Sequence, residues 1–237
     1  HSTVRFWDLR YYYSAKCYEN NNTHIPMPDF VAINGSASMS AYIESGYPVN
    51  KLKSVESLRH LDLENIVLKR SIHLDKLNRP IKVLVMGDYL ASNTLIQMQL
   101  LKKAADFFSN NIHITIKTHP ANPLLPGICN YINHLKSDDS IAKLIIQCDI
   151  AYSSGATSAA VDAYCSGKPL ISVLDPKILN LSPLRGKESV YFIRNSQELI
   201  AAITEIVFLN QAPTNKNTFF TIDKQLPRWR KILSDNT

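Results

Sequence analysis

The segment covering residues 149–173, DIAYSSGATSAAVDAYCSGKPLISV, constrains the fold of this chain more than any other stretch. It begins with a short apolar run, Ile150-Ala151-Tyr152, and it ends with a second one at residues 170–173. A hydroxyl-rich turn and a run of small residues suited to a helix lie between the two. A strand, a turn, a helix and a second strand in this order are typical of a parallel sheet. The segment therefore predicts one unit of an α/β fold.

Further apolar runs extend the predicted sheet in both directions along the chain. Strands are predicted at 81–86, 112–117 and 190–193, and helices at 94–108, 128–135, 140–147 and 197–209. Strands that alternate with helices along the chain favour a parallel sheet covered by helices on both faces. The fold class predicted here is therefore α/β, with a Rossmann-like parallel sheet.

The same pattern divides the chain into three parts. Residues 81–209 carry the regular alternation and form the predicted core domain. Residues 1–80 are predicted to be a linker with partial elements of an N-terminal or interdomain region, and residues 210–237 a tail that ends in a helix. Because the chain begins with His1, we expect it to be a piece of a longer protein.

The turn after Tyr152 is a candidate phosphate site. Ser153, Ser154, Gly155 and Thr157 lie where a strand passes into a helix. The first N–H groups of a helix have no partner within the helix and carry a partial positive charge, which favours an anion. In the helix that follows, Asp162 is expected either to bind a ribose hydroxyl or to lie exposed to solvent.

Two other strand ends carry candidate site residues. Lys117 ends the strand at 112–117 and His119 follows it, and Pro120 keeps His119 out of a helical conformation. An imidazole held there can bind a phosphate oxygen or protonate a leaving group. Gly87 and Asp88 follow the strand at 81–86. Because ligands bind outside the carboxyl ends of parallel strands, all these residues are expected to surround one phosphate.

The first thirteen residues, HSTVRFWDLRYYY, are rich in aromatic side chains and include Arg5, Asp8 and Arg10. They are interpreted either as a segment of another domain that folds against this one, or as the acceptor-side wall of the site.

Composition and missing motifs narrow the function. A formal charge of +6 at pH 7 is compatible with an anionic ligand or a membrane surface, but no basic stripe interleaved with aromatics indicates nucleic acid. The four cysteines lack metal-ligand spacing and are expected to be reduced, which favours the cytoplasm. No G-x-G-x-x-G or P-loop sequence is present, and no D-x-D sequence indicates a metal.

The pair of motifs K-x-H-P at 117–120 and S-S-G-x-T-S at 153–158 resembles the C-terminal, donor-binding half of GT-B glycosyltransferases. It is most similar to bacterial enzymes of surface-carbohydrate biosynthesis that use cytidine nucleotides: the sialyl-, Kdo- and nonulosonate transferases, and the CDP-glycerol glycerophosphotransferases. The resemblance implies that His119 contacts the donor phosphate and that Ser153 and Ser154 hold it. It also implies that residues 81–209 bind a nucleotide sugar, and that the acceptor's general base belongs to an N-terminal domain outside this chain.

The expected function is thus the donor-binding portion of a glycosyltransferase that moves a sugar, from a CMP-activated nonulosonate or Kdo-type donor, to a cell-surface glycan or lipid-linked acceptor. Neither a metal nor a further cofactor is expected. The protein is expected in the cytoplasm, with peripheral contact with the inner membrane as an additional option. Two alternatives stay open: a nucleotide-sugar epimerase of the same shape, and a non-catalytic nucleotide- or glycan-binding module in a capsule assembly complex.

Overall fold

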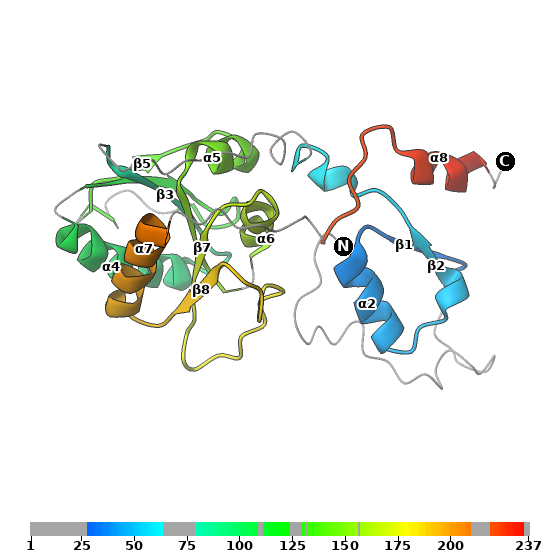
Figure 1. The fold of residues 1–237 in the computed structure, drawn as a ribbon, viewed down its shortest axis with the longest axis horizontal. Coiled ribbons are helices and arrows are strands. Elements are labelled where there is room, and N and C mark those ends of the chain that lie inside the picture. Colours follow the sequence, from blue (N-terminus) through cyan, green and yellow to red (C-terminus); the bar gives the residue numbers. More distant parts are fainter. Residues whose placement is uncertain are drawn as a thin grey trace.

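A six-stranded parallel sheet forms the centre of the computed structural model (Figure 1), which describes residues 28–63, 79–108, 111–123, 129–130, 132–155, 157–209 and 219–234. Its strand order is β5-β4-β3-β6-β7-β8, and every neighbouring pair is parallel. The strands are β3 (Ile81–Met86), β4 (Ile112–Lys117), β5 (Leu135–Lys136), β6 (Ile150–Ser154), β7 (Leu170–Val173) and β8 (Val190–Ile193). The predicted helix at 128–135 is wrong, because its last residue begins β5 instead.

Helices cover both faces of this sheet, as predicted. The helices are α4 (Ala91–Phe107), α5 (Ile141–Gln147), α6 (Ser158–Cys165) and α7 (Ser196–Leu209). Helices α4 and α7 share one buried apolar cluster with the sheet, and α5 and α6 share a second cluster with the other face. Strand β3 supplies Val83 and Val85 to the first cluster and Leu84 and Met86 to the second. Burial on both faces explains why β3, β6 and β7 are almost continuously apolar, whereas β4 alternates and exposes His113.

A smaller unit precedes the sheet along the chain. It pairs β1 (Val31–Ile33) in parallel with β2 (Leu52–Ser54), and α2 (Ser36–Glu44) connects them. Gly35 begins this connection, and a Cβ there would lie 1.6 Å from the carbonyl oxygen of Phe219. Only a glycine therefore lets the C-terminal segment pass so closely over the small unit.

The C-terminal helix α8 (Pro227–Ser234) packs on the smaller unit rather than on the sheet (Figure 1). The buried carboxylate of Glu56 accepts hydrogen bonds from the backbone N–H groups of Arg228 and Trp229, at 3.1 and 3.2 Å. The indole N–H of Trp229 donates to the carbonyl oxygen of Glu56 at 2.8 Å. A carboxylate at the beginning of a helix satisfies its first N–H groups and complements its dipole. Across the described ranges, no helix is long and apolar enough to cross a membrane.

Candidate functional site

The strand order reverses between β3 and β6, and a cavity opens at this point. From β3 the chain adds β4 and β5 on one side, and then it crosses to add β6, β7 and β8 on the other. The connections that leave β3 and β6 diverge, which creates a crevice outside the carboxyl ends of the two strands. The cavity there has a volume of about 820 Å³. This volume lies within the range of small-molecule binding sites.

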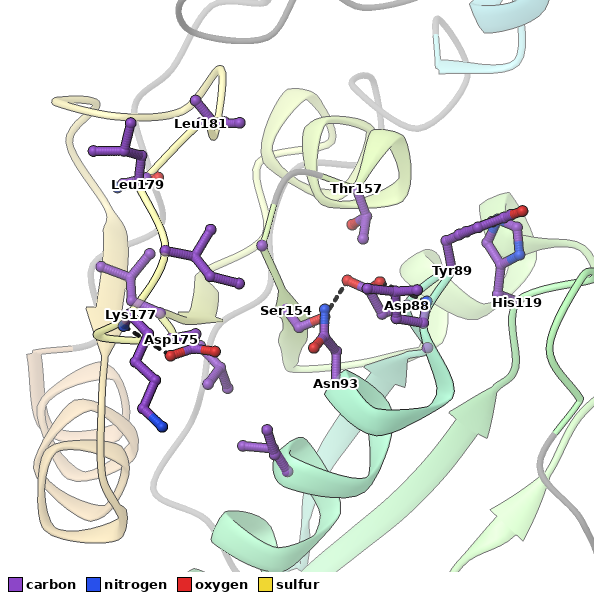
Figure 2. A pocket seen from close by; sticks show the side chains of 18 of the residues that line it. Asp88, Tyr89, Asn93, His119, Ser154, Thr157, Asp175, Lys177, Leu179 and Leu181 are labelled. Atoms are coloured by element: carbon purple, nitrogen blue, oxygen red, sulfur yellow. Dashed lines mark hydrogen bonds between the residues drawn. The ribbon is translucent and has the colours of Figure 1, made fainter.

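Six of the predicted site residues line this cavity together: Gly87, Asp88, His119, Ser154, Gly155 and Thr157. Figure 2 shows how Asp88, His119, Ser154 and Thr157 lie. They come from the ends of three neighbouring strands and from the residue that precedes α6. Parallel strands bring their carboxyl ends to one edge of the sheet. The sequence alone was therefore enough to predict the residues at the centre of the cavity.

A hydrogen bond joins the two sides of the reversal. The hydroxyl of Ser154, at the end of β6, donates to Oδ2 of Asp88 after β3, at 2.5 Å. The backbone N–H of Leu90 donates to the other carboxylate oxygen at 2.9 Å. The backbone N–H of Asp88 donates in turn to the hydroxyl of Thr94 on α4, at 2.9 Å. These bonds hold the Asp88 carboxylate at one orientation on the cavity wall.

Two glycines bring the loops of the site close together. A Cβ on Gly87 would lie 3.1 Å from the backbone nitrogen of His119, which is tighter than ordinary contact. The loops after β3 and β4 therefore approach each other as they do because Gly87 has no side chain. Gly155 adopts a φ of 48°, in the left-handed region that side chains disfavour. It turns the chain from β6 toward α6.

His119 is held from several sides. Its Nδ1 accepts a hydrogen bond from the backbone N–H of Ala121 at 3.1 Å. The edge of the Tyr89 ring meets the imidazole at a centroid distance of 5.5 Å and an angle of 80°. The side chain of Asn122 donates to the carbonyl oxygen of Tyr89, which ties the two loops together. With Nδ1 accepting, the neutral imidazole carries its proton on Nε2, so this nitrogen is a donor.

Four predicted residues do not line the cavity: Lys117, Pro120, Ser153 and Asp162. Lys117 ends β4, and its carbonyl oxygen accepts from the N–H of Gly87 at 2.9 Å. Ser153 alternates with Ser154 along β6, so its side chain points to the other face of the sheet. It is fully buried there, and its hydroxyl has no hydrogen-bond partner among the residues that the structure describes. Arg5, Asp8 and Arg10 lie outside the described residues.

The structure corrects both expectations for Asp162. This residue is neither exposed nor directed into the cavity, because α6 buries it against His60. Asp162 Oδ1 lies 3.1 Å from His60 Nε2, which is ion-pair distance, although the two atoms are not aligned as a hydrogen bond. The other ring nitrogen of His60 is 2.7 Å from the hydroxyl of Ser57, and the ring stacks on Phe220 at 3.7 Å. Asp162 therefore attaches α6 to the segment that leads into the sheet.

The sequence reasoning missed one whole wall of the cavity. The loop between β7 and β8 contributes Asp175 and Lys177 together with apolar side chains, and Arg194 follows β8. The apolar members of this wall are Leu174, Pro176, Ile178, Leu179, Leu181 and Pro183. The same strand-end rule that located Gly87 and Ser154 also points to the residues after β7. Asp175, two residues past the strand, was the available signal.

The clearly shifted pKa values belong to groups away from this cavity. At the amino end of β6, burial opposes ionisation of Asp149, but hydrogen bonds from Arg79 and from the backbone of Lys82 outweigh it and lower its pKa. Burial lowers the pKa of Lys168 and raises that of Cys148 to about 12. Lys168 Nζ donates to the carbonyl oxygens of Ile146 and Cys148. These contacts hold the end of α5 and the beginning of β6 in place, so the roles of these groups are structural.

No set of three or more His, Cys, Asp or Glu side chains suited to a metal ion occurs within the described part of the chain. The charged groups of the cavity are instead distributed over two walls. Asp88 lies beside the beginning of α6, whereas Lys177 lies on the opposite loop (Figure 2). A ligand in this cavity therefore meets a carboxylate and a helix N-terminus on one side, and Asp175, Lys177, Arg194 and apolar groups on the other.

Comparison with known proteins gives a match at the level of structure only. No family model matches the chain, and no curated protein is detectably similar to it in sequence. UDP-GlcNAc 2-epimerase from Methanocaldococcus jannaschii, in complex with UDP-GlcNAc and UDP, matches with a TM-score of 0.57 and 12% identity, over 87% of this chain and 61% of that one. UDP-GlcNAc 2-epimerase from Neisseria meningitidis, bound to UDP-GlcNAc, matches with a TM-score of 0.58 and 11% identity, over 87% of this chain and 60% of that one.

The wall teichoic acid polymerase TagF also matches, with a TM-score of 0.55 and 9% identity, over 88% of this chain and 57% of that one. This chain thus spans about three fifths of the length of the solved proteins it resembles. At such low identity the likeness concerns the fold. It confirms the predicted α/β class: the protein has a Rossmann-like parallel sheet with helices on both faces, of the kind found in GT-B-shaped enzymes.

Proposed function

We propose that this chain is the donor-binding part of a glycosyltransferase that uses a nucleotide-activated sugar. The observation that carries the proposal is the cavity at the strand-order reversal, which His119 and the beginning of α6 line together. This is where open parallel sheets bind nucleotides. The motifs K-x-H-P and S-S-G-x-T-S supply those same residues, and the fold likeness to enzymes bound to UDP-GlcNAc supports the same ligand class.

The donor phosphate is assigned to the beginning of α6. Thr157 caps this helix by accepting a hydrogen bond from the N–H of Ala160 at 3.3 Å. The N–H groups of the first turn, at Ser158 and Ala159, precede the first intrahelical hydrogen bond, and both residues line the cavity. An anion placed there is stabilised by these donors and by the helix dipole.

His119 is proposed as the catalytic residue. When the bond between the anomeric carbon and the phosphate oxygen breaks, its electron pair passes to that oxygen. The Nε2–H of His119 then donates a hydrogen bond to that oxygen, which stabilises the negative charge on the leaving group. The acceptor hydroxyl attacks the anomeric carbon and gives its proton to a general base. We place that base in the part of the protein beyond this chain, because the chain spans only about three fifths of the similar structures.

Asp88 receives a different role from the one that the sequence favours. Its carboxylate is a fixed negative charge with acceptor atoms only, so direct contact with a phosphate would be repulsive. The same atoms suit the hydroxyl groups of a sugar. We therefore assign Asp88 to the donor's hydroxyl groups and leave the phosphate to α6 and His119.

The base of the donor is the finer part of the proposal. The resemblance of the motifs favours a CMP-linked nonulosonate or Kdo-type sugar, whereas two similar structures hold uridine nucleotides. Both donors share a pyrimidine and an α-phosphate. The acceptor is proposed to be a cell-surface glycan or a lipid-linked precursor, the latter reached by peripheral contact with the inner membrane.

Nucleotide binding tests the proposal directly. CMP, CDP, UDP, GDP and ADP are titrated into the protein while its melting temperature is followed, since a ligand of the folded state raises Tm with concentration. A rise with CMP or UDP is expected, and it should be smaller in the variants His119→Ala and Thr157→Val. A rise in Tm with CMP but not UDP supports a CMP-linked donor, whereas a rise with UDP but not CMP contradicts a CMP-linked donor. No rise with any pyrimidine nucleotide overturns the proposal.

The epimerase alternative keeps one specific observation in its favour, because two of the similar structures are UDP-GlcNAc 2-epimerases. The two activities differ in their need for an acceptor. Incubation with UDP-GlcNAc alone separates them: formation of a 2-epimer or release of UDP without any acceptor supports the epimerase. An intact donor under these conditions, together with sugar transfer when the acceptor is supplied to the full-length protein, supports the transferase.

A further inference from the structure

An arginine from outside the sheet contacts the beginning of α6. Arg59 lies in the short 3₁₀ turn at Leu58–His60, before the chain enters the sheet. Its Nη2 donates a hydrogen bond to the hydroxyl of Ser158, at 3.2 Å and across 99 positions of sequence. Ser158 is the first residue of α6 and lines the cavity. The guanidinium thus meets the helix end to which the donor phosphate is assigned.

The neighbours of Arg59 hold its backbone in place. The N–H of Ser57 donates to the carbonyl oxygen of Thr221 at 2.8 Å. His60, on the other side of Arg59, is almost fully buried between Ser57, Phe220 and Asp162. Since Asp162 belongs to α6, the turn that carries Arg59 is attached to the helix that carries Ser158. The backbone of Arg59 is therefore fixed by the buried contacts of its neighbours, although the side chain itself is exposed.

The charges around the cavity explain why a phosphate at the beginning of α6 needs a cation such as Arg59. Asp88 places a negative charge on the same side of the cavity as Thr157, whereas Lys177 lies on the opposite wall (Figure 2). That wall, formed by the residues after β7 and β8, also carries Asp175 and Arg194. A phosphate at the beginning of α6 thus needs a nearby cation to offset the repulsion from Asp88. An arginine suits this need, because its planar fork of N–H groups matches the oxygens of a phosphate.

We propose that Arg59 is a donor-binding residue that contacts the phosphate of the nucleotide sugar at the beginning of α6. The assignment rests on the proposed function, because it requires the phosphate to be at that helix end. It makes the segment Val55–Leu63 part of the donor site. Occupation of the site then strengthens the attachment between the sheet and the smaller unit, since one ligand contacts both.

The test compares phosphate-bearing and phosphate-free ligands. Affinities of the wild type, Arg59→Met and Arg59→Lys are measured by calorimetry for CMP and UDP and for cytidine and uridine. Loss of a charge-assisted contact predicts about tenfold weaker binding of the nucleotide by Arg59→Met. Binding of the nucleoside should stay unchanged, and Arg59→Lys should fall in between. The steepness with which added salt weakens nucleotide binding should also decrease in Arg59→Met.

Arg230→Met is the matched control, because Arg230 is exposed on α8, away from the cavity. It should bind like the wild type. If the wild type binds no pyrimidine nucleotide, the proposed function fails and this inference fails with it. If the wild type binds and Arg59→Met binds equally well, only the assignment of Arg59 is overturned. Equal weakening of nucleotide and nucleoside also overturns it, since Arg59 then supports α6 without contacting phosphate. If Arg59→Met fails to fold, the same comparison of nucleotide and nucleoside binding is made between Arg59→Lys and the wild type.

Discussion

The hydroxyl of Ser154 donates a hydrogen bond to Asp88 across the point where the strand order reverses. The two residues follow adjacent strands, β6 and β3, and Met86 pairs with Ser153 at the end of their shared ladder. Both lie at the edge of the cavity. The contact therefore fixes a negative charge at the place where two loops separate, and the predictions for the site depend on that charge.

Replacement of this charge should strengthen nucleotide binding and weaken catalysis. Asp88→Asn retains an oxygen for the N–H of Leu90 but removes the charge that repels a phosphate. We expect CMP or UDP to bind about fivefold more tightly, corresponding to roughly 1 kcal/mol of relieved repulsion. Turnover of the sugar donor should fall, and Asp106→Asn, on the exposed side of α4, should change neither. Weaker nucleotide binding in Asp88→Asn would instead place Asp88 in direct contact with the nucleotide.

Removal of the imidazole at position 119 should affect turnover more than binding of the product nucleotide. Loss of a positioned hydrogen-bond donor to the charge that develops on the leaving group typically reduces the rate by about 10²–10³-fold. His119→Ala is compared with His113→Ala in single-turnover assays of sugar transfer, since His113 is exposed on the same strand. A rate for His119→Ala within a factor of about two of the rate for His113→Ala would contradict the catalytic role.

The ion pair at the amino end of β6 should make stability depend on pH. Arg79 donates two hydrogen bonds to Asp149, at 2.7 and 2.8 Å, and the backbone N–H of Lys82 donates another at 2.8 Å. Because the pKa of Asp149 is lowered in the folded state, its stabilisation is complete above the unfolded pKa of about 3.9 and is lost as the pH falls through the lower folded value.

Asp149→Asn should therefore lose about 1–3 kcal/mol of unfolding free energy at pH 7, as for other hydrogen bonds to charged groups. The difference from the wild type should shrink below pH 4 in urea titrations. Asp139→Asn is the control, since its pair with Lys143 is exposed and is worth about 0.5 kcal/mol or less. A difference that is constant between pH 3 and pH 7 would contradict the assignment.

A methyl group at position 35 should separate the C-terminal segment from the smaller unit. A Cβ there would lie 1.6 Å from the backbone of Phe219, which cannot yield as a flexible side chain can. Gly35→Ala should therefore cost more than the roughly 1–3 kcal/mol of ordinary overpacking. In Gly186→Ala the added Cβ has open space, so only the strain of a φ of 72°, about 1 kcal/mol, is expected. Equal melting temperatures for the two variants would contradict the close approach.

The sequence was sufficient for five of the six strands of the sheet, all but β5, and for the centre of the cavity. The apolar runs at 81–86 and 170–173 indicate burial on both faces, and the run at 112–117 alternates as expected for burial mainly on one face. Glycines or hydroxyl residues mark where the chain leaves the sheet after 81–86 and 150–152. Strand ends are local features, and the parallel arrangement brings them together. These parts of the fold therefore did not depend on knowing distant partners.

The features of the site that could not be predicted from the sequence depend on contacts between distant segments of the chain. Asp162 was assigned to a ligand or to solvent, but it is buried because His60 arrives from a separate part of the chain. The two serines of the S-S-G motif looked equivalent, yet alternation along β6 directs only Ser154 into the cavity. Arg59 carries no motif at all, and only the three-dimensional path of its turn brings it to α6.

The chain passes between the sheet and the smaller unit more than once. Residues 55–63 lead into the sheet, and residues 219–226 lead back to α8, with Ser57 and Thr221 hydrogen-bonded where the two passages run together. Phe219 and Phe220 belong to the buried cluster that α6 shares with the sheet, and the ring of Phe220 stacks on His60. His60 in turn lies against Asp162 of α6. Both passages are therefore packed on α6, the helix whose beginning lines the cavity, as well as on each other.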